Sequence, residues 1–101
     1  MPDNSVYNIK YTSRSLKDAL IIKEYLLYKF TQKEVNRFYH MLGVFESLVS
    51  KFPKLYAESP KSKNVRRAVL SKQLSVFYKI TTDTVMILAI LDNRMDTIKW
   101  P

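Results

Sequence analysis

The stretch from residue 65 to residue 94 most constrains what this chain can fold into. It reads as three β-strands joined by two short turns, at residues 65–70, 76–80 and 85–91. The middle segment is rich in β-branched and aromatic residues that alternate as strand residues do. The last segment is apolar on both faces, which is typical of a strand covered above and below. We therefore expect an antiparallel meander whose last strand is central in a sheet.

A strand and a first helix are expected before this meander. Residues 6–11 alternate loosely, and the apolar last strand is the most plausible partner for them. From residue 16 to 30 the period becomes helical. Ser15 and Asp18 have the spacing of a capping box at its start. The apolar stripe of this helix is expected to consist of Leu16, Ala19, Leu20, Leu27 and Phe30, widened by Ile22 and Leu26.

A second helix is expected over residues 31–52. Thr31 and Glu34 form another capping box, and Pro53 ends the helix. The lone Gly43 lies inside it, where glycine costs about 1 kcal/mol relative to alanine. Either a neighbour approaches closely there, or the cost is simply carried. The apolar stripe is regular: Val35, Phe38, Leu42, Phe45, Val49 and Phe52. A short link makes the two helices an antiparallel hairpin.

The order strand, helix, helix and three strands predicts an α+β fold. A helical hairpin would pack on one face of one small sheet. With 101 residues, we expect a single domain over residues 1–101. The absence of cysteine, of a signal-peptide pattern and of an apolar run of about 18 residues favours a cytoplasmic protein without a membrane span.

Little in the sequence points to metal, cofactor or histidine chemistry. There is one histidine, His40, and no cysteine, so we expect neither a metal site nor a bound cofactor. A single glycine excludes a glycine-rich phosphate loop. The helical carboxylates are interpreted as solvated partners of nearby basic residues: Asp18, Glu24, Glu34 and Glu46.

What remains is positive charge, with a formal net charge of +8. No acidic residue occurs between Ser59 and Thr82, although several lysines and arginines do. Contact with phosphate or with an acidic protein segment would suit these cations equally well. Arg94 lies at the far end of the last strand. We take the candidate residues for binding such a partner to be Lys61, Lys63, Arg66, Arg67, Lys72 and Arg94, with Lys79 in the same stretch.

Several phrases, in this order and spacing, resemble the RelE/ParE superfamily of toxins from type II toxin–antitoxin pairs. They are IKYTSRSLKDAL at residues 9–20, P-x-L-Y at 53–56, VRRAVL at 65–70, SVFYKI at 75–80 and VMILAILDNRMD at 85–96. The resemblance covers residues 7–96, and Arg94 with Asp96 matches an ending that ParE-like members often have.

The resemblance implies one of two targets. RelE-like toxins cut messenger RNA on the ribosome with arginines, lysines and a C-terminal aromatic residue, whereas ParE-like toxins inhibit DNA gyrase. Arg94 and Trp100 fall where RelE-like enzymes keep an arginine and a tyrosine, but Leu70 replaces another arginine. Trp100 also cannot transfer a proton as tyrosine might.

We therefore predict a non-enzymatic, ParE-like gyrase inhibitor. The alternative is a metal-independent RelE-like endoribonuclease, for which the candidate catalytic residues are Arg94, Trp100, Arg67 and Lys72. A degenerate toxin acting only as a binding module is the third hypothesis. The resemblance also implies a cognate antitoxin in a hetero-oligomer. Its acidic, amphipathic C-terminal segment would lie along both helices and pair with the region of Arg66 and Arg67.

Overall fold

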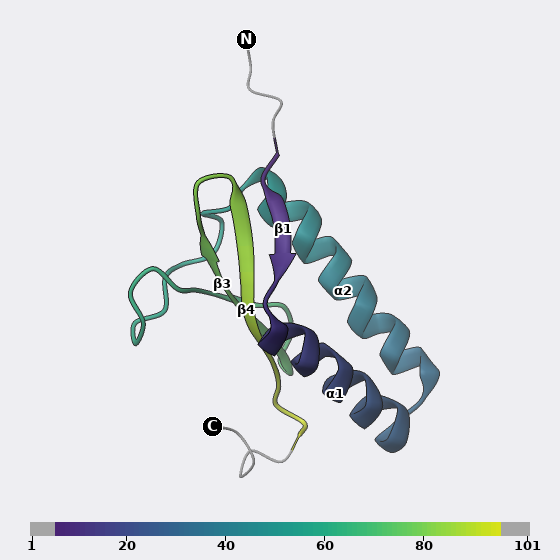
Figure 1. The fold of residues 1–101 in the computed structure, drawn as a ribbon. Coiled ribbons are helices and arrows are strands. Elements are labelled where there is room, and N and C mark those ends of the chain that lie inside the picture. Colours follow the sequence, from purple (N-terminus) through teal and green to yellow (C-terminus); the bar gives the residue numbers. More distant parts are fainter. Residues whose placement is uncertain (1–5, 96–101) are drawn as a thin grey trace.

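The computed structural model of the chain describes residues 6–95. Four strands form one sheet in the order β1-β4-β3-β2, with β1 parallel to β4 and the other pairs antiparallel (Figure 1). The predicted α+β fold, the meander and the central last strand are confirmed. The elements are β1 (Asn8–Tyr11), α1 (Ser13–Lys29), α2 (Gln32–Lys51), β2 (Arg66–Val69), β3 (Leu74–Ile80) and β4 (Thr84–Asp92).

One face of the sheet packs on the helices and carries the core. Ile87 and Ile90 of β4 both point into the core and are at most 2% exposed, although simple alternation would put residues three apart on opposite faces. A β-bulge between Phe77 and Tyr78 shifts the register opposite Leu88. Leu88 and the residues of the opposite face are only partly buried. The expectation that β4 would be covered on both sides is therefore wrong, because both helices pack on the same side.

The first turn of α1 completes the edge of β4 beyond the end of β1. Backbone N–H of Thr12 donates to Ile87 O (3.0 Å), and its hydroxyl donates to Leu88 O (3.1 Å). Further along, the carboxylate of Asp18 accepts from Ile90 N (3.0 Å). These side chains thus satisfy backbone groups that would otherwise be an exposed strand edge.

This anchoring corrects two predictions about α1. The N-cap is Thr12, whose hydroxyl accepts from the backbone N–H of Ser15 (3.1 Å), so the predicted capping box of Ser15 and Asp18 does not form. The buried face of the helix is also rotated away from the centre of the predicted stripe, although Ile22 and Leu26, expected to widen that stripe, are buried as predicted. It is centred on Ser15, Ile22 and Leu26, while the predicted core residues Leu16, Leu20, Leu27 and Phe30 are 58%, 51%, 49% and 46% exposed.

Helix α2 follows its predicted stripe more closely. Its five regular apolar positions from Val35 to Val49 are buried, although Phe52 at the C-cap is exposed. Thr31 is the N-cap but makes no side-chain capping bond, so the second predicted capping box does not form either. A Cβ added at Gly43 would meet no heavy atom within 4 Å. The loss of helix stability caused by this glycine is therefore not explained by a close neighbour.

The far end of the core is aromatic. The Tyr78 hydroxyl donates to Pro53 O (2.7 Å), and burial raises the pKa of Tyr78. Its ring packs edge-on against Phe45 and Tyr56. These contacts fix the start of the long loop between α2 and β2, and they make Tyr78 part of the core.

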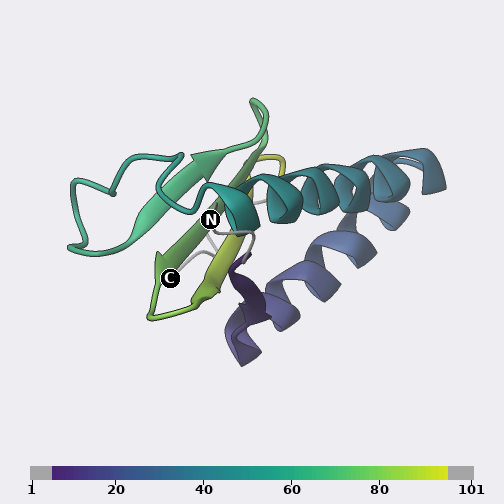
Figure 2. The same ribbon diagram turned by 90° about the horizontal axis from the view of Figure 1, so that it is seen from above.

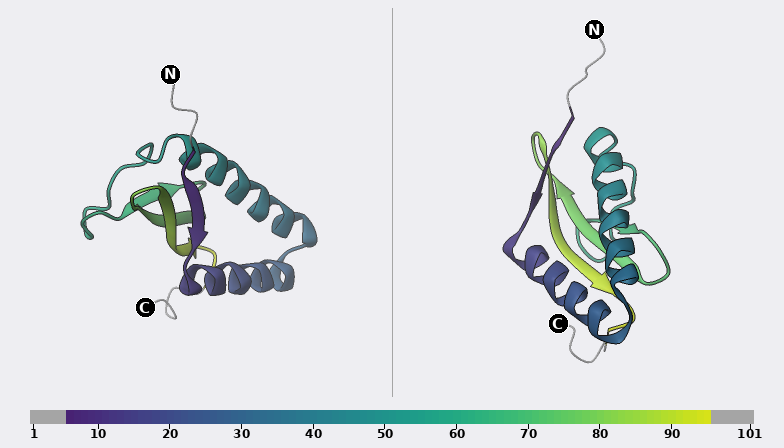
Figure 3. Two further views of the ribbon diagram at one scale, coloured as in Figure 1. Left: turned by 45° about the horizontal axis from the view of Figure 1, so that its top comes forward. Right: turned by 90° about the vertical axis from the view of Figure 1, so that its right-hand side faces the viewer.

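The two helices diverge from their short link (Figures 2 and 3). They are antiparallel in the chain, but seen from above they spread apart, and β1 closes the open side of the resulting wedge (Figure 3, left). No helix within residues 6–95 has the length and apolar character needed to cross a membrane.

Candidate functional site

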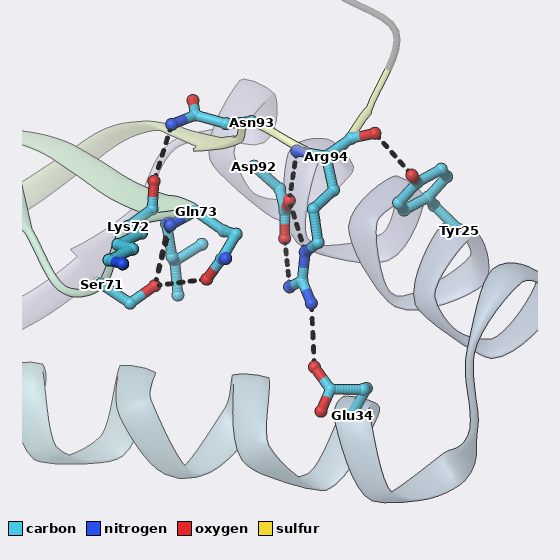
Figure 4. Close-up of polar contacts among 9 residues, drawn as sticks. Tyr25, Glu34, Ser71, Lys72, Gln73, Asp92, Asn93 and Arg94 are labelled. Carbon is cyan, nitrogen blue, oxygen red and sulfur yellow. Dashed lines mark hydrogen bonds and ion pairs between the residues drawn. The ribbon is translucent and has the colours of Figure 1, made fainter.

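Arg94 lies in the most highly connected polar cluster of the described chain (Figure 4). Its Nε and Nη2 donate to the two carboxylate oxygens of Asp92, at 3.0 and 2.7 Å. Its Nη1 donates to Glu34 Oε1 at 2.8 Å. These hydrogen bonds to Asp92, together with the bond to Glu34, raise the pKa of Arg94 above its usual value although burial opposes the shift. The guanidinium is therefore a permanently charged group held between two carboxylates.

Asp92 is the anchor of this cluster. Its side chain is 0% exposed, whereas those of Arg94 and Glu34 each keep 26% of their surface. Besides the guanidinium, Asp92 Oδ1 accepts from the backbone N–H of Arg94 at 2.9 Å. A buried carboxylate is tolerated only when it is paired and hydrogen-bonded, so Asp92 depends on Arg94.

Two contacts from α1 complete the arrangement. The Tyr25 hydroxyl donates to Arg94 O at 2.5 Å, and the guanidinium lies over the Phe30 ring, 5.3 Å from its centroid. Met95 N bonds back to Asp92 O. We call the five residues Tyr25, Phe30, Glu34, Asp92 and Arg94 the Arg94 clasp. It ties the end of β4 to both helices at their link.

The turn between β2 and β3 is joined to the same end of β4. The Asn93 side-chain amide donates to Lys72 O (2.9 Å), and Asn93 N donates to Gln73 O (2.7 Å). The Ser71 hydroxyl accepts from the backbone N–H groups of Gln73 and Leu74. Lys72 is exposed on this turn, so the structure places it near Arg94 in the fold but outside the clasp.

The sheet face opposite the helices carries a separate set of cations. Cross-strand pairs share a face, and Met86 pairs with Lys79 on one side and with Lys10 on the other. The two lysines are therefore two strand spacings apart, about 10 Å. We call the residues Lys10, Arg67, Phe77, Lys79 and Met86 the open face.

Arg67 extends the open face toward the sheet edge. It pairs with Phe77 across the strands, its guanidinium lies 5.8 Å from the centre of that ring, and its Nη2 donates to Ser75 Oγ at 3.4 Å. The rows that cross this face contain no acidic residue between β1 and β2. The open face thus combines three cations with an aromatic ring, a combination suited to phosphate contact or stacking.

The other predicted residues do not join this surface. Arg66 points to the other side of β2, where it donates to Tyr56 O (2.7 Å) and lies 3.8 Å from a Glu58 oxygen. Lys61 and Lys63 are exposed on the loop before β2. Trp100 and Asp96 lie outside the described residues. Lys10, which sequence reasoning missed, belongs to the open face through the parallel pairing of β1 with β4.

The histidine and the helical carboxylates lie apart from the cations of the open face. His40 is exposed on α2. No three His, Cys, Asp or Glu residues gather as a metal site within residues 6–95. The carboxylates interpreted as solvated are mostly engaged, since Glu34 holds Arg94, Asp18 holds β4 and Glu46 accepts from the Tyr11 hydroxyl. Burial, reinforced by Glu46, raises the pKa of Tyr11 well above its usual value, so its hydroxyl stays protonated at neutral pH.

A groove of about 440 Å³ opens in the wedge between the helices. Its apolar wall includes Leu16 and Leu20, both more than half exposed. The residues lining it are Tyr11, Leu16, Ala19, Leu20, Lys23, Tyr39, Leu42, Gly43 and Glu46. The rotation of α1 away from its predicted stripe therefore leaves that stripe beside an open groove.

No protein-family model and no curated protein matches this sequence. Solved structures do match. A chain of the chromosomal ParDE TA system from P. aeruginosa has a TM-score of 0.72 at 15% identity, over 86% of this chain and 96% of that one. The fold is that of the RelE/ParE toxins. Chains of two further complexes agree with this RelE/ParE fold.

One is the E. coli DinJ-YafQ toxin-antitoxin complex, with a TM-score of 0.58 at 15% identity over 87% of this chain and 93% of that chain. The other is the toxin-antitoxin complex RelBE2 from Mycobacterium tuberculosis, with a TM-score of 0.59 at 14% identity over 89% and 94%. At such identities the likeness concerns the RelE/ParE fold alone.

Proposed function

We propose that this chain is the toxin of a type II toxin–antitoxin pair, and that it acts in the cytoplasm in the ParE-like manner, by blocking DNA gyrase. The observation that carries the choice of target is the open face, which presents Lys10, Arg67 and Lys79 with no histidine or carboxylate among them. Such a surface attracts an anionic partner but offers no histidine or carboxylate as a general base. The TM-score of 0.72 with the ParDE chain supports the same branch.

The ribonuclease alternative is disfavoured by the same residues. Leu70 takes the place of an arginine that RelE-like enzymes use, and Arg94 is already bonded to two carboxylates. Cleavage of RNA needs a group that accepts a proton within reach of the substrate. The open face carries lysines and an arginine, which suit electrostatic contact with a phosphate, but no histidine or carboxylate that would serve as a general base.

The proposed partner is an antitoxin with an acidic, amphipathic segment. The similar structures include toxin–antitoxin complexes, and this chain has the features that such a segment would cover. Exposed leucines line the groove between α1 and α2, and the net charge of +8 favours an acidic partner. A hetero-oligomer would bury those leucines.

A supercoiling assay with purified gyrase tests the target. We expect the wild-type protein to inhibit supercoiling and to leave ribosome-bound mRNA uncut. The variant R67A/K79A should need at least about ten times more protein for half-inhibition, the change that a loss of about 1.4 kcal/mol of binding free energy produces. New mRNA ends in the ribosomal A site would instead support the ribonuclease.

The matched control is K17A/K33A, which removes two exposed lysines from the helices and lowers the net charge equally. It should inhibit gyrase like the wild type. Equal weakening by both double variants would mean that net charge acts and not the open face. Failure of every form to arrest growth, inhibit gyrase or cut mRNA would support the degenerate module.

A further inference from the structure

Sequence reasoning makes Arg94 a target contact, but its surroundings are electrostatically unsuited to that role. A guanidinium has five N–H donors, and three of those of Arg94 bond to Asp92 and Glu34. One positive charge is therefore outweighed locally by two negative ones. An approaching phosphate or acidic side chain would meet both carboxylates at the same point.

The contacts of Arg94 instead join segments far apart in the chain. Asp92 ends β4 and Arg94 lies in the turn after it, Glu34 lies in the first turn of α2, and Tyr25 and the C-cap Phe30 lie at the end of α1. Figure 4 shows Glu34 and Tyr25 reaching Arg94 from different helices. The clasp therefore defines how the helical link is seated against the end of the sheet.

The backbone of the clasp is held as well as the side chains. Asp92 accepts from Arg94 N, Tyr25 donates to Arg94 O, and Met95 N bonds to Asp92 O. Met95 itself is partly buried against the core. The turn over residues 92–95 is thus fixed on both sides, and with it the point at which the chain leaves the sheet.

We propose that Arg94 is a positioning residue of this protein and not a contact to its target. Resting on the proposed gyrase inhibition, Arg94 supports activity by fixing the turn at residues 92–95 and the helical link. It does so through Asp92, Glu34 and Tyr25. Substituting those partners should then imitate the substitution of Arg94 itself.

The decisive experiment compares E34Q, Y25F, R94K and R94A in the gyrase supercoiling assay, at a temperature where circular dichroism shows each variant folded. Positioning predicts that E34Q and Y25F weaken inhibition in the same direction as R94A. It also predicts that R94K fails to rescue, because an ammonium cannot bridge two carboxylates as a guanidinium does. Inhibition should weaken by at least about tenfold for R94A.

Direct contact predicts the opposite for E34Q. That variant removes one of the two negative charges and frees a donor, so inhibition would be unchanged or stronger. Such a result, with R94K as active as the wild type, overturns the proposal. The matched control is R37A, which removes a positive charge from an exposed neighbour on α2 that lines the same small depression but is outside the clasp. It should leave inhibition at the wild-type level.

A second readout needs no activity and so separates this proposal from the proposed function. Hydrogen exchange of the Arg94 Nε–H and of the Met95 amide, followed by NMR, measures the clasp directly. Both should be protected in the wild type and R37A, and should exchange faster in E34Q and Y25F. Unchanged exchange in those two variants overturns the positioning role. If the wild type fails to inhibit gyrase while the Arg94 Nε–H and the Met95 amide are protected from exchange, only the gyrase target is overturned.

Discussion

Replacing Arg94 by alanine should leave the buried carboxylate of Asp92 without its charged partner. Asp92 has a 0% exposed side chain, and three of its hydrogen bonds come from Arg94, one of them from the backbone. Breaking a buried pair by removing one partner costs about 3–5 kcal/mol. Because the Arg94 side chain keeps 26% of its surface, water can reach part of the site, and we expect about 2–4 kcal/mol.

The same reasoning predicts that a second substitution restores stability. In R94A/D92N the side chain at residue 92 is neutral, and its amide oxygen can still accept from the backbone N–H of residue 94. We expect it to be at least about 1 kcal/mol more stable than R94A, since the uncompensated charge is gone. Urea denaturation of the wild type, both single variants and the double variant closes the cycle.

The result that would refute this reasoning is additivity. If D92N costs as much in the R94A background as in the wild type, the carboxylate is not made unfavourable by the loss of its partner. A loss below about 0.5 kcal/mol for R94A, as for an ordinary surface residue, would also refute it. An unfolding free energy that falls in R94A and is partly recovered in R94A/D92N supports the buried pair.

Further predictions concern the core, the cap and alkaline pH. I87A should cost about 2–5 kcal/mol and L88A less than about 1.5 kcal/mol in urea denaturation, because Ile87 is fully buried and Leu88 lies at the bulge; equal losses would contradict this register. T12A should lower the unfolding free energy by about 1–2 kcal/mol, since it removes a helix cap and a bond to β4; an unchanged denaturation midpoint would argue against both roles. The raised pKa of Tyr11 contributes stability that is present below about pH 10 and is lost as pH rises above it, because an unfolded tyrosine ionises there. Y11F should flatten this alkaline loss in thermal melts from pH 8 to 11, and an identical slope would contradict the assignment.

The elements predicted best are those in which the regularly spaced apolar residues of the sequence lie on the face that packs into the core. Helix α2 and strand β3 each bury one regular apolar face, so their spacing alone indicates which apolar residues are inside, although Ser75 on the other face of β3 is buried as well. Helix α1 has more apolar residues than one face can bury. Its orientation is decided by polar anchors, Thr12 and Asp18, which bond to the edge of β4. Those bonds join residues more than 70 positions apart and leave no local signal.

The candidate site follows the same division. Strand periodicity alone separates Arg66 from Arg67, because neighbouring strand residues point to opposite faces. The contribution of Lys10 depends on the parallel register of β1 with β4, which no local pattern encodes. The clasp is similarly hidden, since Glu34 has the sequence spacing of a capping residue and yet bonds to Arg94.

The pairing of β1 with β4 also limits when the fold can be completed during synthesis. Residues 8–11 leave the ribosome well before their partners at residues 84–87 have been synthesised. Until then the helices have formed without the central strand that most of the core contacts, and an early stop or frameshift before residue 84 removes that strand altogether. Contacts of such long sequence separation also slow folding, because the chain must close a large loop before they form. A ribosome-bound chain of this protein therefore remains incompletely folded until β4 emerges, so that any activity begins only after that strand has been made.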